Sequence, residues 1–176
     1  RSCVLCALQN VKSAIPYATT PKTTTSSTSS SSDEELILNP IIDLSGWQLP
    51  QDIDYDVLSN HISGAIVRVF GGSLISKDSN AASSNGVDKS FKTHIKELKK
   101  RDVPVAVYSY AQGTSVKEMK EEARIFYKNA SPYKPTYYWI DVEEETMSNM
   151  EQGVQAFLAE LKRLGAENVG LYIGRS

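Results

Sequence analysis

Short runs of β-branched and aromatic residues alternate with amphipathic stretches from Ile41 to the end of the sequence. The first kind predicts strands and the second predicts helices, as where Phe91, Ile95 and Leu98 recur at helical spacing. Strict alternation of this kind indicates an α/β fold, with a parallel sheet and helices packed outside it. The expected strands span 41–44, 65–70, 103–110, 136–142 and 169–173; the expected helices span about 54–62, about 91–98, a stretch capped by Thr114, and 148–164.

Two architectures fit this alternation, a (β/α) barrel and an open doubly wound sheet. Periodicity does not separate them, because both place parallel strands between helices. A complete eight-stranded barrel usually takes about 250 residues. Residues 41–176 are too few for that, so a barrel reading implies an incomplete barrel with about five β–α units, the N-terminal part of a larger domain.

The sequence before Ile41 has a different character. Ser and Thr dominate residues 19–32, which offer no apolar groups to offset the ordering cost of ~1–2 kcal/mol per residue. We therefore expect residues 19–40 to form a disordered linker. Residues 1–18 hold a short apolar segment behind Arg1, and we interpret them as a clipped signal or anchor segment. Cys3 and Cys6 form a C-x-x-C without the second ligand pair of a zinc site or the βαβ context of a redox motif, and a lipoprotein-type cysteine at Cys6 fits its surroundings poorly.

The charge balance and hydropathy exclude several classes of partner. The chain has 19 Lys and Arg against 21 Asp and Glu, a formal net charge of −2. That balance supplies no long-range attraction for phosphate backbones, so we expect no nucleic-acid partner. No apolar run approaches the ~20 residues that cross a bilayer, so we expect no transmembrane span in the folded part.

Acidic side chains follow two of the expected strands at their carboxyl ends. Asp43 lies at the end of the first, and Asp141 and Glu143 lie at the end of the fourth. Residues two apart on a strand point the same way, so Asp141 and Glu143 share a face with Cβ atoms about 6–7 Å apart. Like charges at that range raise one pKa, which suits a carboxylic acid that protonates a leaving group. The alternative is that these are ordinary loop acids, since Glu144 and Glu145 continue the run.

Six segments together resemble glycoside hydrolase family 25, the Chalaropsis-type lysozymes or N-acetylmuramidases. They match in order and spacing, and the resemblance covers Ile41 to Gly174. It implies a modified (β/α) barrel of the TIM-like glycosidase type. The segments are I-I-D-L-S-G-W-Q (41–48), A-I-V-R-V-F-G-G (65–72), V-D-K-S-F (87–91), V-P-V-A-V-Y-S-Y-A (103–111), Y-W-I-D-V-E (138–143) and V-G-L-Y-I-G (169–174).

The resemblance also implies an activity and a site. The enzyme would cleave the β-1,4 bond from N-acetylmuramic acid to N-acetylglucosamine in peptidoglycan, with Glu143 as general acid. Asp141 would orient and support the reacting centre, with Asp43 as a further carboxylate. The sugar cleft would be lined by Tyr110, Tyr108 and Trp47. No metal or cofactor is needed, and spacing leaves open whether a covalent intermediate, the substrate's N-acetyl group or direct water attack is used.

The sequence also departs from the family pattern. Members continue through further strands, and a late strand carries one more aspartate of the site; this chain stops at Ser176. We therefore expect a fragment of a longer protein, secreted or tethered at the cell surface and monomeric when complete. The alternatives are a non-catalytic cell-wall glycan-binding module and an open doubly wound small-molecule binder. His61 and His94 fall on expected helices, and we interpret both as surface or packing residues.

Overall fold

The computed structural model describes residues 39–71, 81 and 85–174. The expected signal or anchor segment (1–18) and the expected linker up to residue 38 lie outside the described residues. Within the described part, each of the five expected strands is present. The strands are β1 (Ile41–Leu44), β2 (Gly64–Phe70), β3 (Val105–Tyr110), β4 (Tyr138–Val142) and β5 (Val169–Ile173).

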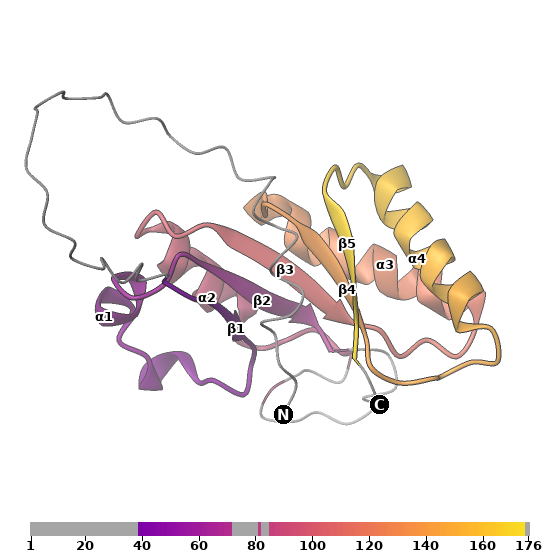
Figure 1. Ribbon diagram of the computed structural model, residues 1–176, viewed down its shortest axis with the longest axis horizontal. Coiled ribbons are helices and arrows are strands. Elements are labelled where there is room, and N and C mark those ends of the chain that lie inside the picture. The colour runs from indigo at the N-terminus through magenta and orange to yellow at the C-terminus, as the bar shows by residue number, and fades with distance from the viewer. Residues whose placement is uncertain (1–38, 72–80, 82–84, 175–176) are drawn as a thin grey trace, which may run out of the picture. The chain divides into compact units, whose positions relative to one another are not determined.

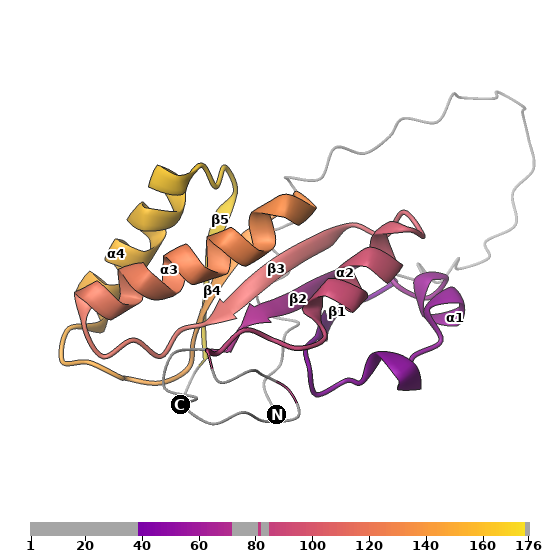
Figure 2. The ribbon, with the colours of Figure 1, turned by 180° about the vertical axis from the view of Figure 1, so that it is seen from behind.

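The strands form one parallel sheet in the order β1-β2-β3-β4-β5. The α/β fold with a parallel sheet is thus confirmed. β1 and β5 lie at the two edges, so the sheet of the described residues is not closed into a barrel. The larger helices are α2 (Phe91–Lys99), α3 (Val116–Ala130) and α4 (Met150–Leu164), and they lie on one side of the sheet (Figures 1 and 2).

Local sequence explains where most helices begin and end. The Asp54 side chain accepts bonds from the amides of Asp56 and Val57, which starts α1 (Tyr55–Ser59). That helix is shorter than the expected 54–62, and His61 lies beyond it. Ser115, not Thr114, caps α3, because its hydroxyl accepts from the amide of Glu118. α4 ends at Gly165, whose φ of 105° favours a residue without a Cβ.

The core lies between the sheet and these helices. Along β4, Tyr138, Ile140 and Val142 are buried, and the Tyr138 ring meets Phe126 of α3 edge to face at 5.8 Å. Trp139 and Asp141 alternate with them and therefore point to the opposite face. We call that opposite side the carboxylate face; it carries Asp43, Arg68, Tyr108, Tyr110, Trp139 and Asp141.

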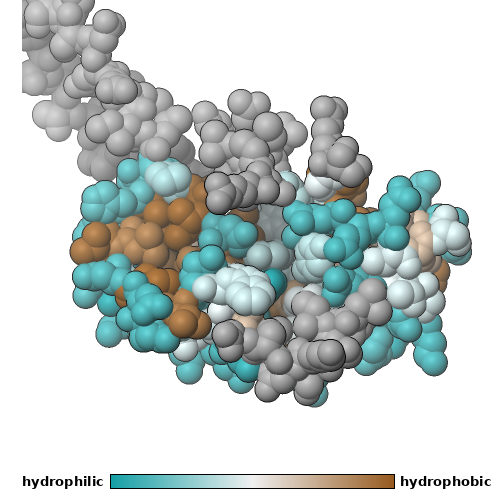
Figure 3. Space-filling model, turned by 90° about the horizontal axis from the view of Figure 1, so that it is seen from below, coloured by the Kyte–Doolittle hydropathy of each residue, from teal (hydrophilic) through white to brown (hydrophobic). Residues whose placement is uncertain are grey.

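Figure 3 shows the molecule from below, with apolar side chains gathered at the end where β1 and α1 lie. The exposed large apolar residues of that end include Leu49, 37% exposed, and Val57, 55% exposed. The 3-10 turn η3 (Pro50–Asp52) lies between these two residues in the sequence.

No helix among the described residues is both long enough and apolar enough to span a bilayer.

Candidate active site

The acidic side chains of β1 and β4 lie on the same face of the sheet. Asp141 pairs with Tyr110 on β3 and with Tyr172 on β5, so these three residues form one row across three strands. Asp43 is the third residue of β1. Glu143 follows β4 directly, two residues after Asp141, and leaves the sheet at the same end. The expectation that carboxylates gather at the carboxyl ends of the strands therefore agrees with the backbone.

Asp141 has an electrostatic environment suited to acid chemistry. Its side chain is half-buried, and Oδ1 has no hydrogen-bond partner among the described residues. Burial, and then the charges of Glu143 and Asp43, raise the pKa of Asp141 to about 7, while Arg68 opposes the shift. A carboxyl with that pKa is partly protonated at neutral pH, so it can hold and release a proton there. The spacing of Asp141 and Glu143 predicts that one pKa is raised without saying which, and a raised pKa is found at Asp141. The general-acid role that the resemblance implies for Glu143 stays a prediction.

Asp43 lies beside a tyrosine of the next strand but one. The hydroxyl of Tyr108 donates to Oδ2 of Asp43 across 3.5 Å. Burial raises the pKa of Asp43, the bond from Tyr108 and the charge of Arg68 lower it, and the charges of Glu143 and Asp88 raise it. The same contact and burial raise the pKa of Tyr108. Asp43 and Tyr108 thus lie together, as two of the predicted site residues should.

The two remaining predicted residues, Tyr110 and Trp47, differ in where they lie relative to the carboxylate face. Tyr110 lies on it, and its hydroxyl donates to Oε1 of Glu144 at 3.0 Å. Trp47 lies in the loop after β1 and is 63% exposed. Within the described part of the chain, no hydrogen bond or ring contact joins the Trp47 side chain to the carboxylates. Its role as a lining residue stays a prediction.

Two residues that the sequence reading did not assign to the site are part of it. Arg68 lies on the carboxylate face of β2, in register with Tyr108. Its Nε donates to Oδ2 of Asp88 at 3.0 Å, and the Asp88 side chain is fully buried. A signal was present for Arg68, because a charged residue interrupts the apolar alternation of A-I-V-R-V-F. Asp88 lies in V-D-K-S-F (87–91), one of the six segments that carry the family resemblance, and this was the sign that it could belong to the site.

The histidines lie away from the carboxylate face, as the sequence indicated. His94 is fully buried on α2, where Nδ1 lies 2.6 Å from the Tyr55 hydroxyl and Nε2 lies 3.1 Å from the Ser45 carbonyl. Burial lowers the pKa of His94. His61 is exposed and bonds the Val57 carbonyl. None of these three contacts involves a site carboxylate.

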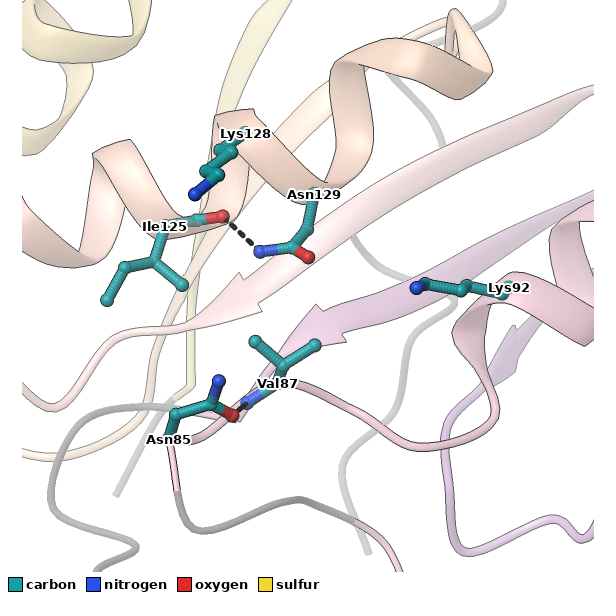
Figure 4. A pocket seen from close by; sticks show the side chains of 6 residues that line it. All are labelled: Asn85, Val87, Lys92, Ile125, Lys128 and Asn129. Carbon is teal, nitrogen blue, oxygen red and sulfur yellow. Dashed lines mark hydrogen bonds between the residues drawn. The ribbon is translucent and has the colours of Figure 1, made fainter.

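A cavity of about 390 Å³ lies elsewhere, against α2, α3 and the segment before α2 (Figure 4). It is lined by Asn85, Val87, Lys92, Ile125, Lys128 and Asn129. These helices cover the other side of the sheet, and among the described residues that line the cavity there is no carboxylate. It therefore does not form part of the candidate active site.

A comparison with models of protein families shows which family the chain belongs to. The model of Glycosyl hydrolases family 25 matches residues 42–176, from the second residue of β1 to beyond the end of β5. The chain belongs to this family. A search of curated proteins finds no match to this family 25 chain.

Solved structures agree with the family. GHIP of Streptococcus pneumoniae, a glycosyl hydrolase 25 described as a virulence factor participating in host cell invasion, is 57% identical with a TM-score of 0.75. That match covers 78% of this chain and 60% of GHIP. The catalytic domain of endolysin ply40 from bacteriophage P40 of Listeria monocytogenes is 22% identical with a TM-score of 0.63, over 76% of this chain and 62% of that chain.

A third neighbour is the modular autolysin LytC from Streptococcus pneumoniae, 23% identical with a TM-score of 0.60, over 76% of this chain and 32% of LytC. At 22–23% identity, ply40 and LytC show the shared fold alone. The family 25 chain spans less than two thirds of the length of each of these three proteins.

Proposed function

We propose that this family 25 chain carries the acid–base part of a peptidoglycan hydrolase site, that of a muramidase which cleaves the β-1,4 bond between N-acetylmuramic acid and N-acetylglucosamine. Three observations support the proposal. The chain belongs to a glycosyl hydrolase family, its structural neighbours include an autolysin and an endolysin, and LytC is known in complex with a synthetic peptidoglycan ligand. The observation that carries it is the Asp141–Glu143 pair, with its raised pKa at Asp141.

Glycoside hydrolysis needs a proton for the leaving oxygen and negative charge near an oxocarbenium-like centre. In our proposal Glu143, the more exposed of the pair, donates the proton to the glycosidic oxygen. Asp141, whose pKa is raised by burial and by the charge of Glu143, holds a proton at neutral pH and supports the developing positive charge when ionised. Asp43 adds a further carboxylate to the same face.

The substrate side of the proposal follows from the aromatic residues. Tyr108 and Tyr110 offer rings and hydroxyls beside the carboxylates, and Trp47 offers an exposed indole at the loop after β1. Aromatic rings present both apolar area and polar handles, which suits sugar rings. We propose peptidoglycan glycan strands as the partner, an extracellular or surface-tethered location, and closure of the (β/α) barrel in the complete protein, which would act as a monomer without a metal or cofactor.

Clearing of a cell-wall suspension by the full-length protein tests the assignment. Glu143→Gln keeps the size of the side chain but has no proton of the required acidity, so clearing should fall by about 10²-fold or more. Glu145→Gln is the matched control, since Glu145 is an exposed acid two residues further on. Equal clearing by both variants would remove Glu143 from its role.

The second candidate is a non-catalytic cell-wall glycan-binding module. The exposed indole of Trp47 and the rings of Tyr108 and Tyr110 favour it, because aromatic rings can hold sugars without any catalytic step. Sedimentation with insoluble cell walls separates the two. Binding without clearing by the native protein would support the module, and clearing that depends on Glu143 would support the hydrolase.

A further inference from the structure

Asp88 is buried beneath the carboxylate face with an unusual number of donors. Its residue is 2% exposed, and its carboxylate accepts four hydrogen bonds. Oδ1 accepts from the amides of Ser90 at 2.8 Å and Phe91 at 3.1 Å, at the start of α2. Oδ2 accepts from the amide of Gly46 at 2.7 Å and from Nε of Arg68 at 3.0 Å. One buried carboxylate therefore joins α2, β2 and the loop after β1.

The contact with Gly46 fixes the loop that follows Asp43. The amide of Gly46 and the carbonyl of Ser45 belong to one peptide group, and that carbonyl lies 3.1 Å from Nε2 of His94. The peptide is thus held from both sides, by Asp88 at its N–H and by His94 at its oxygen. Gly46 also lies against Ala81, where an added Cβ would be 2.2 Å from the Ala81 carbonyl oxygen. The path of the chain from Asp43 to Trp47 is therefore tightly constrained.

The ion pair between Asp88 and Arg68 determines where the guanidinium charge of Arg68 lies on the carboxylate face. Four groups interact with Arg68 or its charge: Asp43 on β1, Tyr108 on β3, Asp141 at the end of β4, and the buried Asp88. Among the described residues, Asp88 is the carboxylate within ion-pair distance of Arg68. The charge of Arg68 already lowers the pKa values of Asp43 and Asp141, so a guanidinium released from Asp88 could pair with either, and a direct pair would hold that carboxylate ionised.

We propose that Asp88 is a positioning residue of this site. It holds Arg68 in an ion pair, so that Arg68 lies beside Asp43 and Asp141 without pairing with either. It also anchors the Ser45–Gly46 peptide. By keeping Arg68 engaged, Asp88 leaves Asp141 able to hold a proton at neutral pH. The proposal deepens the proposed function, on which its relevance to catalysis rests. The positioning itself is a property of the folded chain and can be measured without turnover.

Carbon-13 NMR titration of the Asp and Glu side-chain carboxyls tests it. In Asp88→Asn the charge that pairs with Arg68 is lost, and Nδ2, itself a donor, must face one of the two pairs of donors that the carboxylate now binds. We therefore expect Arg68 to be released. The charge of Arg68 already lowers the pKa of Asp141, and Asp88 is not among the groups that act on it directly. A freed Arg68 can approach Asp141, so the pKa of Asp141 should fall by about 1 or more. The protonated fraction of Asp141 at pH 8 would then drop about tenfold. An unchanged titration of Asp141 would overturn the proposal.

A double-mutant cycle and a matched control separate positioning from general loss of structure. In an Arg68→Gln background, Asp88→Asn should leave the Asp141 titration nearly unchanged, because the cation is gone. Asp56→Asn is the control, since Asp56 also bonds the Nε of an arginine, Arg101 at 2.7 Å, but on the exposed surface. A lowered pKa of Asp141 that persists without Arg68, or that also follows Asp56→Asn, would contradict the proposed route.

A measurement on the native protein covers the case in which Asp88→Asn does not fold. Because Asp88 holds Nε of Arg68, that N–H should give a nitrogen-15 resonance protected from exchange with water at pH 7. The resonance should persist in Asp141→Asn. An Arg68 N–H in fast exchange would overturn the positioning. If these NMR results hold while Glu143→Gln still clears cell walls, the proposed function fails and the positioning by Asp88 stands.

Discussion

The indole ring of Trp139 lies directly against Gly170 of the neighbouring strand. The two residues are in register between β4 and β5, and a Cβ built on Gly170 would lie 2.3 Å from the ring. Trp139 also stacks on Tyr137 with ring centroids 5.8 Å apart. The absence of a side chain at Gly170 therefore gives the ring its place on the carboxylate face, one row below Asp141.

Gly170→Ala should destabilise the protein by about 1–3 kcal/mol, because the added methyl forces the indole or β5 to move. Thermal unfolding of the variant, followed by the near-ultraviolet signal of the tryptophans, measures the change. Gly64→Ala is the control, since its Cβ would meet its closest neighbour, the Pro104 carbonyl oxygen, at 3.3 Å. An equal loss in both variants would mean that Trp139 is not the cause.

Asp141→Asn should raise stability at neutral and higher pH. The pKa of Asp141 in the folded protein, about 7, lies above its ordinary value of 3.8, so the folded state binds more protons than the unfolded state between these values. Stability therefore falls as the pH rises through that window. Asparagine does not ionise, so the variant should gain in Tm at pH 8 and gain much less at pH 4. A gain of equal size at both pH values would contradict the raised pKa.

Glu160→Gln should lower stability above about pH 4.5 and have little effect near pH 2. Glu160 is almost buried on α4, where Oε1 accepts from Arg124 of α3 at 2.7 Å and Arg163 donates to both of its oxygens. Bonds from Arg163 and then Arg124 lower the pKa of Glu160 to about 2, against the effect of burial. The carboxylate stabilises the fold above its unfolded pKa, and this is lost as the pH falls towards 2.

The loss at pH 7 should be about 1 kcal/mol, because both arginines are half-exposed and solvent screens the pairs. Chemical denaturation at pH 7 and pH 2.5 gives the comparison. Glu121→Gln serves as control, since Glu121 bonds Arg124 from a position that is 59% exposed. A pH-independent effect of Glu160→Gln would mean that the ion pairs are not what the variant removes.

Ser115→Ala should cost about 1 kcal/mol of stability, because the amide of Glu118 loses its capping partner at the start of α3. Thr114→Ala should change stability by less than about 0.5 kcal/mol, since Thr114 is exposed and bonds only the exposed side chain of Glu118. Denaturant midpoints of the two variants test the assignment. A larger loss for Thr114→Ala would return the cap to the residue that the sequence favoured.

Local pattern was enough for the features that depend on a few neighbouring residues. The β–α alternation predicted all five strands, and the last expected helix ends at residue 164, as α4 does. Asp141 and Glu143 were placed on one face, because a period of two is a local property of an extended strand. Boundaries were less accurate: α1 is only Tyr55–Ser59, because one turn of helix and its cap carry too little signal.

Contacts between distant residues depended on the tertiary structure. The bond between Tyr108 and Asp43 joins residues 65 apart, and the one between Gly46 and Asp88 joins residues 42 apart. Such contacts need the register of parallel strands, which is set by helices packing across the sheet and not by any single segment. The raised pKa of Asp141 likewise comes from burial and from charges that only the folded sheet assembles.

Residue types and their periodicity predicted the order of strands and helices, the acids at the strand ends and the family. The raised pKa of Asp141 and the ion pair of Arg68 with Asp88 arise in the folded protein alone. Propensity and periodicity act over a few neighbouring residues, whereas desolvation and Coulomb interaction depend on distances through space.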